Sequence, residues 1–133
     1  MKYRLLDILA CPYCRHSPLK LIVFTRRKYP ERKIEFGKIP VCEYYCQYRE
    51  KFVKDLEEGE ADCNECIKFE VEYGVLICEK CMRWYPIMEE IPVLLPDELR
   101  DRDKDIEFLR KFKEKIPEEI LKNGKPFNLS EEK

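Results

Sequence analysis

Two pairs of cysteines carry the clearest chemical signal in this sequence, and the chemistry that they indicate is metal binding. Cys11 and Cys14 form one Cys-x-x-Cys pair early in the chain, and Cys78 and Cys81 form another far downstream. Each pair can place two thiolates on one tight turn, and a structural zinc site needs two such turns face to face. Four thiolates leave no open position for water, so such a site is structural and not hydrolytic. Rubredoxin-type iron or an iron–sulfur cluster would accept the same ligands.

Four further cysteines lie between the outer pairs, at Cys42, Cys46, Cys63 and Cys66. If the pairs are nested, these inner cysteines form a second site with the spacing C-x3-C-x16-C-x2-C, which is typical of a self-contained zinc loop. Sequential or cross-braced pairing is compatible with the same spacings. A second metal ion, free thiols and disulfide bonds all stay open for the inner cysteines.

The sequence lacks the residues of a typical active site. His16 is the only histidine, and without a second histidine or an evident nucleophile it has no partner for acid–base catalysis. The four glycines are scattered singly, so the chain contains no glycine-rich phosphate loop. We therefore expect a protein that is not an enzyme.

The charge of the chain is high but balanced, with 26 basic and 27 acidic residues among 133. A net charge of −1 gives no general attraction to nucleic acid or to a membrane surface. No apolar run approaches the roughly 20 residues that span a bilayer, and no signal peptide is recognisable. We expect a cytoplasmic protein without membrane contact, in which cysteines bind metal more readily than they form disulfides.

The segments around the outer cysteines predict an α+β fold with a small zinc-ribbon β-sheet core. Residues 3–9 are expected to form a short amphipathic helix, with Leu5, Ile8 and Leu9 on its apolar face. Alternating or apolar segments typical of strands lie at 19–24, 68–73, 75–77 and 82–87, with Gly74 at a turn. Pro92 lacks a backbone donor, so residues 91–96 are expected at a sheet edge.

Between and after these segments we expect an inserted subdomain and a C-terminal helical extension. The predicted division is a core of residues 1–24 plus 68–96, an insertion of residues 25–67 and a tail of residues 97–133. In the insertion, a helix is expected from about 43 to 57, because one helical face would carry Tyr45, Tyr48, Phe52 and Leu56.

The basic stretch from residue 26 to residue 38 includes aromatic residues, and this mixture can contact RNA. The neutral balance of the chain favours instead a solvated hairpin with Ile34 and Phe36 facing inward and the charges facing outward. In the tail, a surface helix with one apolar stripe is predicted by Ile106, Leu109, Phe112 and Ile116. Pro117 and Gly124 delimit a second short helix, and residues 125–133 are expected to fray.

Three segments together resemble a known family: the run from Leu5 to Cys14, the run from Leu76 to Cys81 and the run from Trp84 to Pro96. In this order they resemble the zinc-ribbon activator subunit of Trm-type methyltransferases. The resemblance implies a non-catalytic partner that forms heterodimers with S-adenosylmethionine-dependent methyltransferases acting on tRNA, rRNA or a translation release factor. It implies that the activator stabilises these enzymes and contacts tRNA or rRNA only indirectly. The insertion departs from the family pattern in carrying the four inner cysteines, where members of the family more often have a plain helical insert.

An apolar surface near the outer cysteines is the expected partner-binding site. The resemblance implies that a strand of the activator extends the sheet of the methyltransferase, and uncovered apolar patches normally mark interfaces. The candidate partner-binding residues are Leu5, Leu6, Ile87, Ile91, Val93, Leu94 and Leu95. The alternative is that the C-terminal helices fold back over them. A second functional interpretation is a free-standing zinc-ribbon module that binds RNA or a translation or transcription factor.

Overall fold

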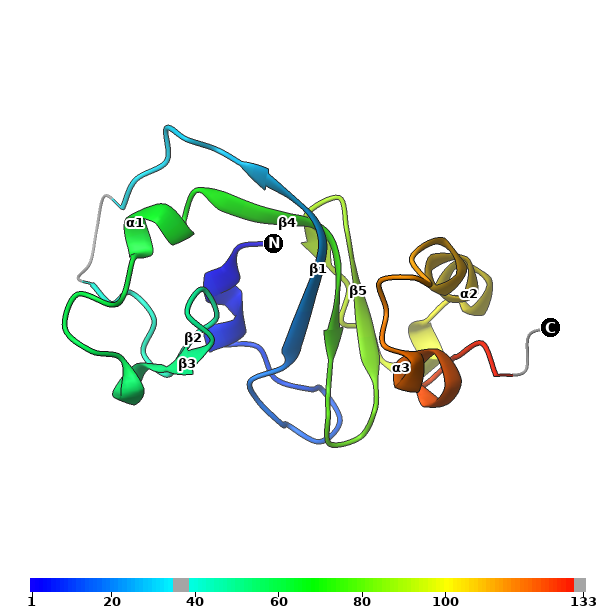
Figure 1. Cartoon of the computed structure of the whole chain (residues 1–133). Helices are drawn as coiled ribbons and strands as arrows, with labels where there is room; N and C mark the ends of the chain where they lie inside the picture. Colours follow the sequence, from blue (N-terminus) through cyan, green and yellow to red (C-terminus); the bar gives the residue numbers. More distant parts are fainter. Residues whose placement is uncertain (35–38, 131–133) are drawn as a thin grey trace.

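The structure, a computed structural model, describes residues 1–34 and 39–130. Its centre is a four-stranded antiparallel sheet in the order β1-β4-β5-β6 (Figure 1). The strands are β1 (Lys20–Lys28), β4 (Phe69–Ile77), β5 (Trp84–Met88) and β6 (Ile91–Pro92). The insertion lies on one side of this sheet and the C-terminal helices lie on the other (Figure 1). The predicted α+β fold is therefore confirmed, and β6 lies at an edge of the sheet, as its proline indicated.

Strand β4 runs without a break through Gly74, so the predicted turn at this glycine is wrong. A Cβ atom at position 74 would lie 2.6 Å from the carbonyl oxygen of Ile22 on β1. The register between β1 and β4 shifts beside this contact, between Val23 and Thr25. Glycine is thus needed for a close approach of two strands and not for a change of direction.

Side chains on the two faces of the sheet belong to two separate cores, as the period of two along a strand requires. Leu76 and Tyr85 face one core, which the 3₁₀ helix η1 (Tyr3–Asp7) covers with the fully buried Leu6. Val75 and Trp84 face the other core, which is covered by the C-terminal helices.

Helix η1 differs from the predicted amphipathic helix in its buried face. Leu6 is the residue that enters the core, whereas 74% of Ile8 is exposed to solvent. The apolar stripe of Leu5, Ile8 and Leu9 assumed α-helical spacing, and a 3₁₀ helix with three residues per turn brings Tyr3 and Leu6 to the same side instead.

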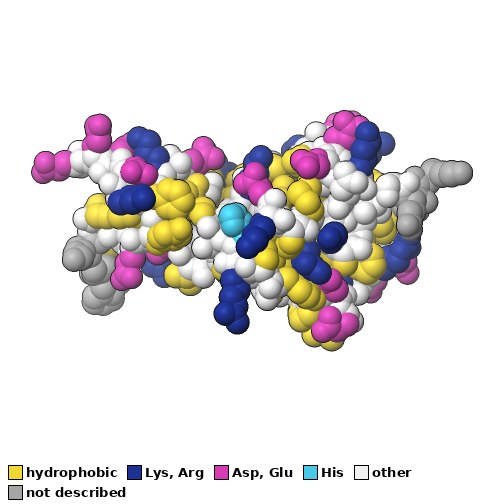
Figure 2. All heavy atoms as spheres, turned by 90° about the horizontal axis from the view of Figure 1, so that it is seen from below, with side chains coloured by type: hydrophobic (Ala, Val, Ile, Leu, Met, Phe, Trp, Pro, Cys, Tyr) yellow, Lys and Arg dark blue, Asp and Glu magenta, His cyan; other side chains and the backbone are white. Residues whose placement is uncertain are grey.

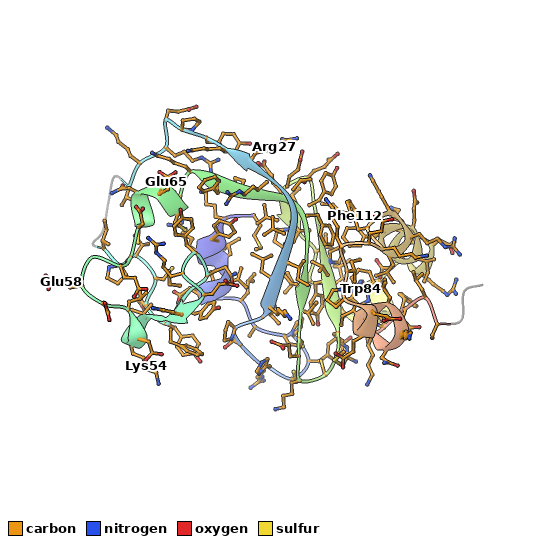
Figure 3. All side chains as sticks on the ribbon, viewed as in Figure 1. Arg27, Lys54, Glu58, Glu65, Trp84 and Phe112 are labelled. Carbon is orange, nitrogen blue, oxygen red and sulfur yellow. The ribbon has the colours of Figure 1, made fainter. Side chains whose placement is uncertain are left out.

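The C-terminal helices α2 (Arg102–Lys111) and α3 (Glu118–Asn123) confirm the predicted tail helices. The Asp101 side chain caps α2 by accepting hydrogen bonds from the N–H groups of Asp103 and Lys104. Figure 3 shows Trp84 and Phe112 pointing into the space between the sheet and these helices. None of the described helices is long and apolar enough to cross a membrane.

The chain stays attached to the sheet after α3, so the predicted fraying of residues 125–133 is wrong for 125–130. The indole N–H of Trp84 donates to the carbonyl of Phe127 at 2.8 Å, and the N–H of Leu129 donates to the carbonyl of Leu121. Residues 131–133 lie outside the described part of the chain.

The insertion contains a small hairpin where a helix over 43–57 was predicted, so this prediction is wrong. Its elements are β2 (Tyr45–Cys46), β3 (Lys51–Phe52), the 3₁₀ helix η2 (Val53–Asp55) and the single turn α1 (Cys63–Cys66). The rings of Tyr44 and Tyr45 pack edge-on against Phe52 across the hairpin, and Glu50 adopts a positive φ of 54° at its turn. Aromatic packing across the hairpin thus overrides the helical spacing. Ile34 is half-buried, and Phe36 lies outside the described residues.

Asp7 joins the insertion to η1. Its carboxylate accepts hydrogen bonds from the N–H groups of Tyr44 and Tyr45, both at 2.7 Å, and of Glu43 at 3.1 Å. Partial burial opposes ionisation of this carboxyl group, but the three N–H groups outweigh burial and hold the pKa of Asp7 below its usual value.

Replacing this carboxylate should loosen the insertion. Asp7→Ala is expected to lower the free energy of unfolding by about 2 kcal/mol at pH 7, since hydrogen bonds to a charged group contribute about 1.5–3 kcal/mol. Asp7→Asn, which keeps one acceptor oxygen, is the control and should lose less. Urea unfolding monitored by circular dichroism measures both differences.

The same difference should depend on pH with a defined sign. Because the pKa of Asp7 is lowered in the folded state, the stabilisation is complete above the unfolded pKa of about 3.9 and is lost as pH falls through the folded pKa. The gap in stability between wild type and Asp7→Ala should therefore narrow below about pH 4. If the difference in stability between wild type and Asp7→Ala were the same below pH 4 as at pH 7, the assigned role of Asp7 would be contradicted.

Candidate metal centre

The two outer cysteine pairs lie on two turns that share one pattern of backbone hydrogen bonds. The N–H of Arg15 donates to the carbonyl of Cys11, and the N–H of Met82 donates to the carbonyl of Cys78, both at 2.8 Å. In each turn the N–H of the first cysteine also donates to the carbonyl five residues later. Arg15 and Met82 have positive φ values of 60° and 65°, which reverses the chain after the second cysteine of each pair.

These two turns lie together at one end of the sheet, because one precedes β1 and the other joins β4 to β5 (Figure 1). The four sulfur atoms all lie within 4.8 Å of one another. The Sγ atoms of Cys11 and Cys81 are 3.6 Å apart, and those of Cys14 and Cys78 are 3.2 Å apart. Tetrahedral bonds of about 2.3 Å place sulfurs about 3.8 Å apart. The predicted outer quartet is thus brought together and can hold one metal ion.

The protein environment favours thiolate at one of these sulfurs. Burial opposes ionisation of Cys11, but the N–H groups of Cys14 and Tyr13 and the hydroxyl of Tyr85 outweigh it and lower the pKa of Cys11 to about 6. The Tyr85 hydroxyl lies 3.5 Å from the Cys11 sulfur. Burial raises the pKa of Cys78 to about 12. Cys11 therefore has the ionisation state that metal binding requires at neutral pH, and a bound cation would be needed to draw the proton from Cys78.

A set of contacts that the sequence did not predict connects the metal centre to the chain after β6. The Arg83 guanidinium lies 3.7 Å from the centre of the Tyr13 ring and donates to the Asp97 carboxylate at 2.8 Å. The N–H of Asp97 in turn donates to the Tyr13 hydroxyl at 2.6 Å. Tyr13 and Asp97 are 84 residues apart in the sequence, so no local pattern indicates their contact. His16 is not part of the sulfur cluster.

The inner cysteines all lie in the insertion, and no disulfide bond joins them in the structure. Cys42 precedes β2, Cys46 is in β2, and Cys63 and Cys66 are the first and last residues of α1. They line one small cavity, although the described residues contain only one tightly gathered group of metal-ligating side chains, the outer quartet. Burial raises the pKa of Cys42 and of Cys66 to about 12 each. Metal binding by the inner cysteines stays a prediction.

The candidate partner-binding residues are divided between the core and the surface. Leu6 and Ile87 are fully buried, and Leu5, Val93 and Leu94 are half-buried. The exposed fraction is 63% for Ile91 and 38% for Leu95. Two exposed apolar residues beyond the predicted set are Ile8 and Leu99. Figure 2, which views the molecule from below, shows that apolar side chains on that face form several patches among charged ones.

The C-terminal helices do not cover these exposed residues. Helices α2 and α3 contribute Ile106, Leu109 and Ile120 to the core that contains Trp84, on the other face of the sheet from Leu94. The sequence left open the alternative that the tail covers these residues. In the structure, the tail helices do not cover Ile91 and Leu95.

Four basic residues at the beginning of the insertion are paired with acidic or aromatic side chains. Arg27 bonds to Glu72, and Lys28 lies 3.2 Å from Glu65. In addition, Arg32 lies 2.8 Å from Glu70, and the Arg26 guanidinium lies 4.0 Å from the centre of the Phe69 ring. These contacts weigh against a free basic surface for RNA in this part of the chain.

A family model described as "Trm112p-like protein" matches residues 2–90, which include all eight cysteines and the sheet up to the end of β5. No curated protein matches the chain.

Breaking the outer quartet should release its metal ion and unfold the sheet. Structural zinc contributes about 10–16 kcal/mol to the folding of small zinc fingers. The total stability of a domain is comparable, at about 5–15 kcal/mol. Cys78→Ser is expected to lose one metal ion per chain and its cooperative thermal transition. The matched control is His16→Ala in the first cysteine turn. This variant should retain the metal ion and the cooperative thermal transition. Elemental analysis and circular dichroism measure these properties, and a folded, metal-loaded Cys78→Ser protein would refute the site.

Proposed function

The chain belongs to the Trm112p-like family, the activators of Trm-type methyltransferases, and on this basis we propose that it is a non-catalytic activating subunit. It binds the catalytic subunit of an S-adenosylmethionine-dependent methyltransferase in the cytoplasm and stabilises it. The substrates of such partners are tRNA, rRNA or a translation release factor, and the activator contacts the RNA only through its partner. The metal ion held by the outer quartet is zinc, since four thiolates suit a structural zinc site.

The uncovered edge of the sheet is the observation that carries this proposal. We define the edge segment as residues 91–95, which comprise β6 and the three residues after it. Ile91 and Leu95 are exposed on this segment, while the tail helices cover the opposite face of the sheet. Exposed apolar side chains beside an open strand edge are what a partner strand can cover.

The backbone of the edge segment is available for pairing with another chain. The N–H of Val93 donates to the carbonyl of Pro86 and thereby holds the segment against β5. By contrast, the N–H groups of Leu94 and Leu95 form no hydrogen bond within the described part of the chain. A methyltransferase strand that pairs here gains main-chain hydrogen bonds, while Leu95 contacts its apolar side chains.

The metal centre supports this function by fixing the position of the edge segment. One cysteine turn leads into β5, which pairs with β6, and the other contains Tyr13. Through Tyr13 and Arg83, both turns contact Asp97, which follows the edge segment. The segment is therefore held at both of its ends, so that little ordering entropy is lost when a partner binds.

The decisive test is whether the edge segment is needed for methyltransferase binding. Tagged wild-type protein purified from native cells should retain a methyltransferase catalytic subunit, identified by mass spectrometry. Leu95→Asp should reduce the retained amount at least tenfold, because a charge buried in an apolar interface without a partner costs several kcal/mol. Since Leu95 is exposed in the isolated chain, the variant should still fold.

Val23→Asp is the matched control, because Val23 is a partly exposed apolar residue on β1, the opposite edge strand of the sheet. It should leave the retained methyltransferase unchanged. If Val23→Asp and not Leu95→Asp abolished retention, the docking edge would be β1. Retention of RNA without any methyltransferase would favour the RNA-binding alternative.

A further inference from the structure

The insertion has too few buried side chains to be held together by apolar packing alone. Among the described residues from 29 to 68, only Cys46 is buried. The regular structure consists of two-residue strands and single helical turns. Segments of this size without a core need cross-links or metal ions to fold stably. Asp7 and the ring of Tyr48, which packs against the rings of Tyr3 and Phe69, anchor the hairpin to the rest of the chain.

The four inner cysteines are placed where a cross-link would join the hairpin to α1. The i, i+3 spacing of Cys63 and Cys66 on α1 puts both sulfurs on the same side of one helical turn. Cys42 and Cys46 come from the hairpin side, and all four side chains line one small cavity. The N–H of Val41 donates to the Cys63 sulfur at 3.5 Å, so the backbone just before Cys42 already contacts the other cysteine pair.

The charge around this cavity also favours a bound thiolate cluster. A divalent ion with four thiolates carries a net charge of −2, which must be balanced nearby when it is partly buried. Lys2, Arg4 and Lys33 line an adjoining cavity together with three of the cysteines, and they outnumber Asp62, the carboxylate that lines the four-cysteine cavity itself. Arg83 has a comparable place beside Cys81 in the outer site.

We propose that Cys42, Cys46, Cys63 and Cys66 bind a second divalent metal ion of the zinc class through four thiolates. Binding replaces the thiol protons, so up to four protons are released and no electron is transferred. The sulfurs are less tightly gathered than those of the outer quartet, and metal binding draws them together. The chain then has nested sites, in which the second ion folds the insertion and the outer ion closes the sheet.

The proposal is tested by counting metal ions on the full-length chain, purified under reducing conditions with zinc. Native mass spectrometry and elemental analysis should give two zinc ions per chain. Cys42→Ser combined with Cys63→Ser should leave one. The control is His16→Ala, which leaves both cysteine quartets intact and should keep two zinc ions. Loading with Co²⁺ in place of zinc should give thiolate charge-transfer absorbance that is twofold higher for wild type than for the inner double variant.

Alkylation of the native, metal-loaded wild type keeps the test decisive even if a variant does not fold. All eight cysteines should be protected, and all should react after chelation. One zinc per chain with the inner four cysteines freely alkylated would overturn the proposal in favour of free thiols. One zinc with inner cysteines that react only after reduction would overturn it in favour of disulfides.

Discussion

The burial of β4 on both faces is the constraint on which the rest of the structure depends. A strand with apolar residues on both sides needs cover on both, and helix η1 supplies it on one side while α2 and α3 supply it on the other. Both edges of β4 are paired, with β1 and β5. Its last residue, Ile77, leads directly into the second cysteine turn. The metal centre, the beginning of the chain and the tail therefore all meet at a single strand.

The features that the sequence predicted correctly depend on neighbours within one element. The cysteine pairs, the proline at the edge strand and the Pro117 and Gly124 boundaries of α3 are of this kind. The incorrect predictions concern residues whose environment is set by distant segments. Gly74 is required by the approach of β1, and the helical spacing of the aromatic residues in the insertion yields to packing across a hairpin. Likewise, the contact of Tyr13 with Asp97 leaves no trace in local sequence.

Structure and family membership divide the molecule into surfaces with different tasks. The face of the sheet that contains Trp84 is closed by the tail of the same chain, with the buried Arg100 joining Asp105 to the carbonyl of Trp84. The edge segment on the opposite side is left open beside the metal centre. On the proposed function, the contribution of such an activator is a rigid edge of fixed shape, which does not require catalytic groups. Several ionisable residues form ion pairs or caps, among them Arg32 with Glu70, Arg83 with Asp97, and Asp101 at the start of α2.

The nesting of the cysteine pairs has a consequence for synthesis on the ribosome. Cys14 and Cys78 are 64 residues apart. At a synthesis rate of about 5–20 residues per second, the second outer pair is therefore made about 3–13 s after the first. During this interval the whole insertion emerges, including all four inner cysteines. The inner group is complete while the outer group is still half formed. The nascent chain thus passes through a stage in which the thiols of Cys11 and Cys14 are exposed to any competing metal or oxidant.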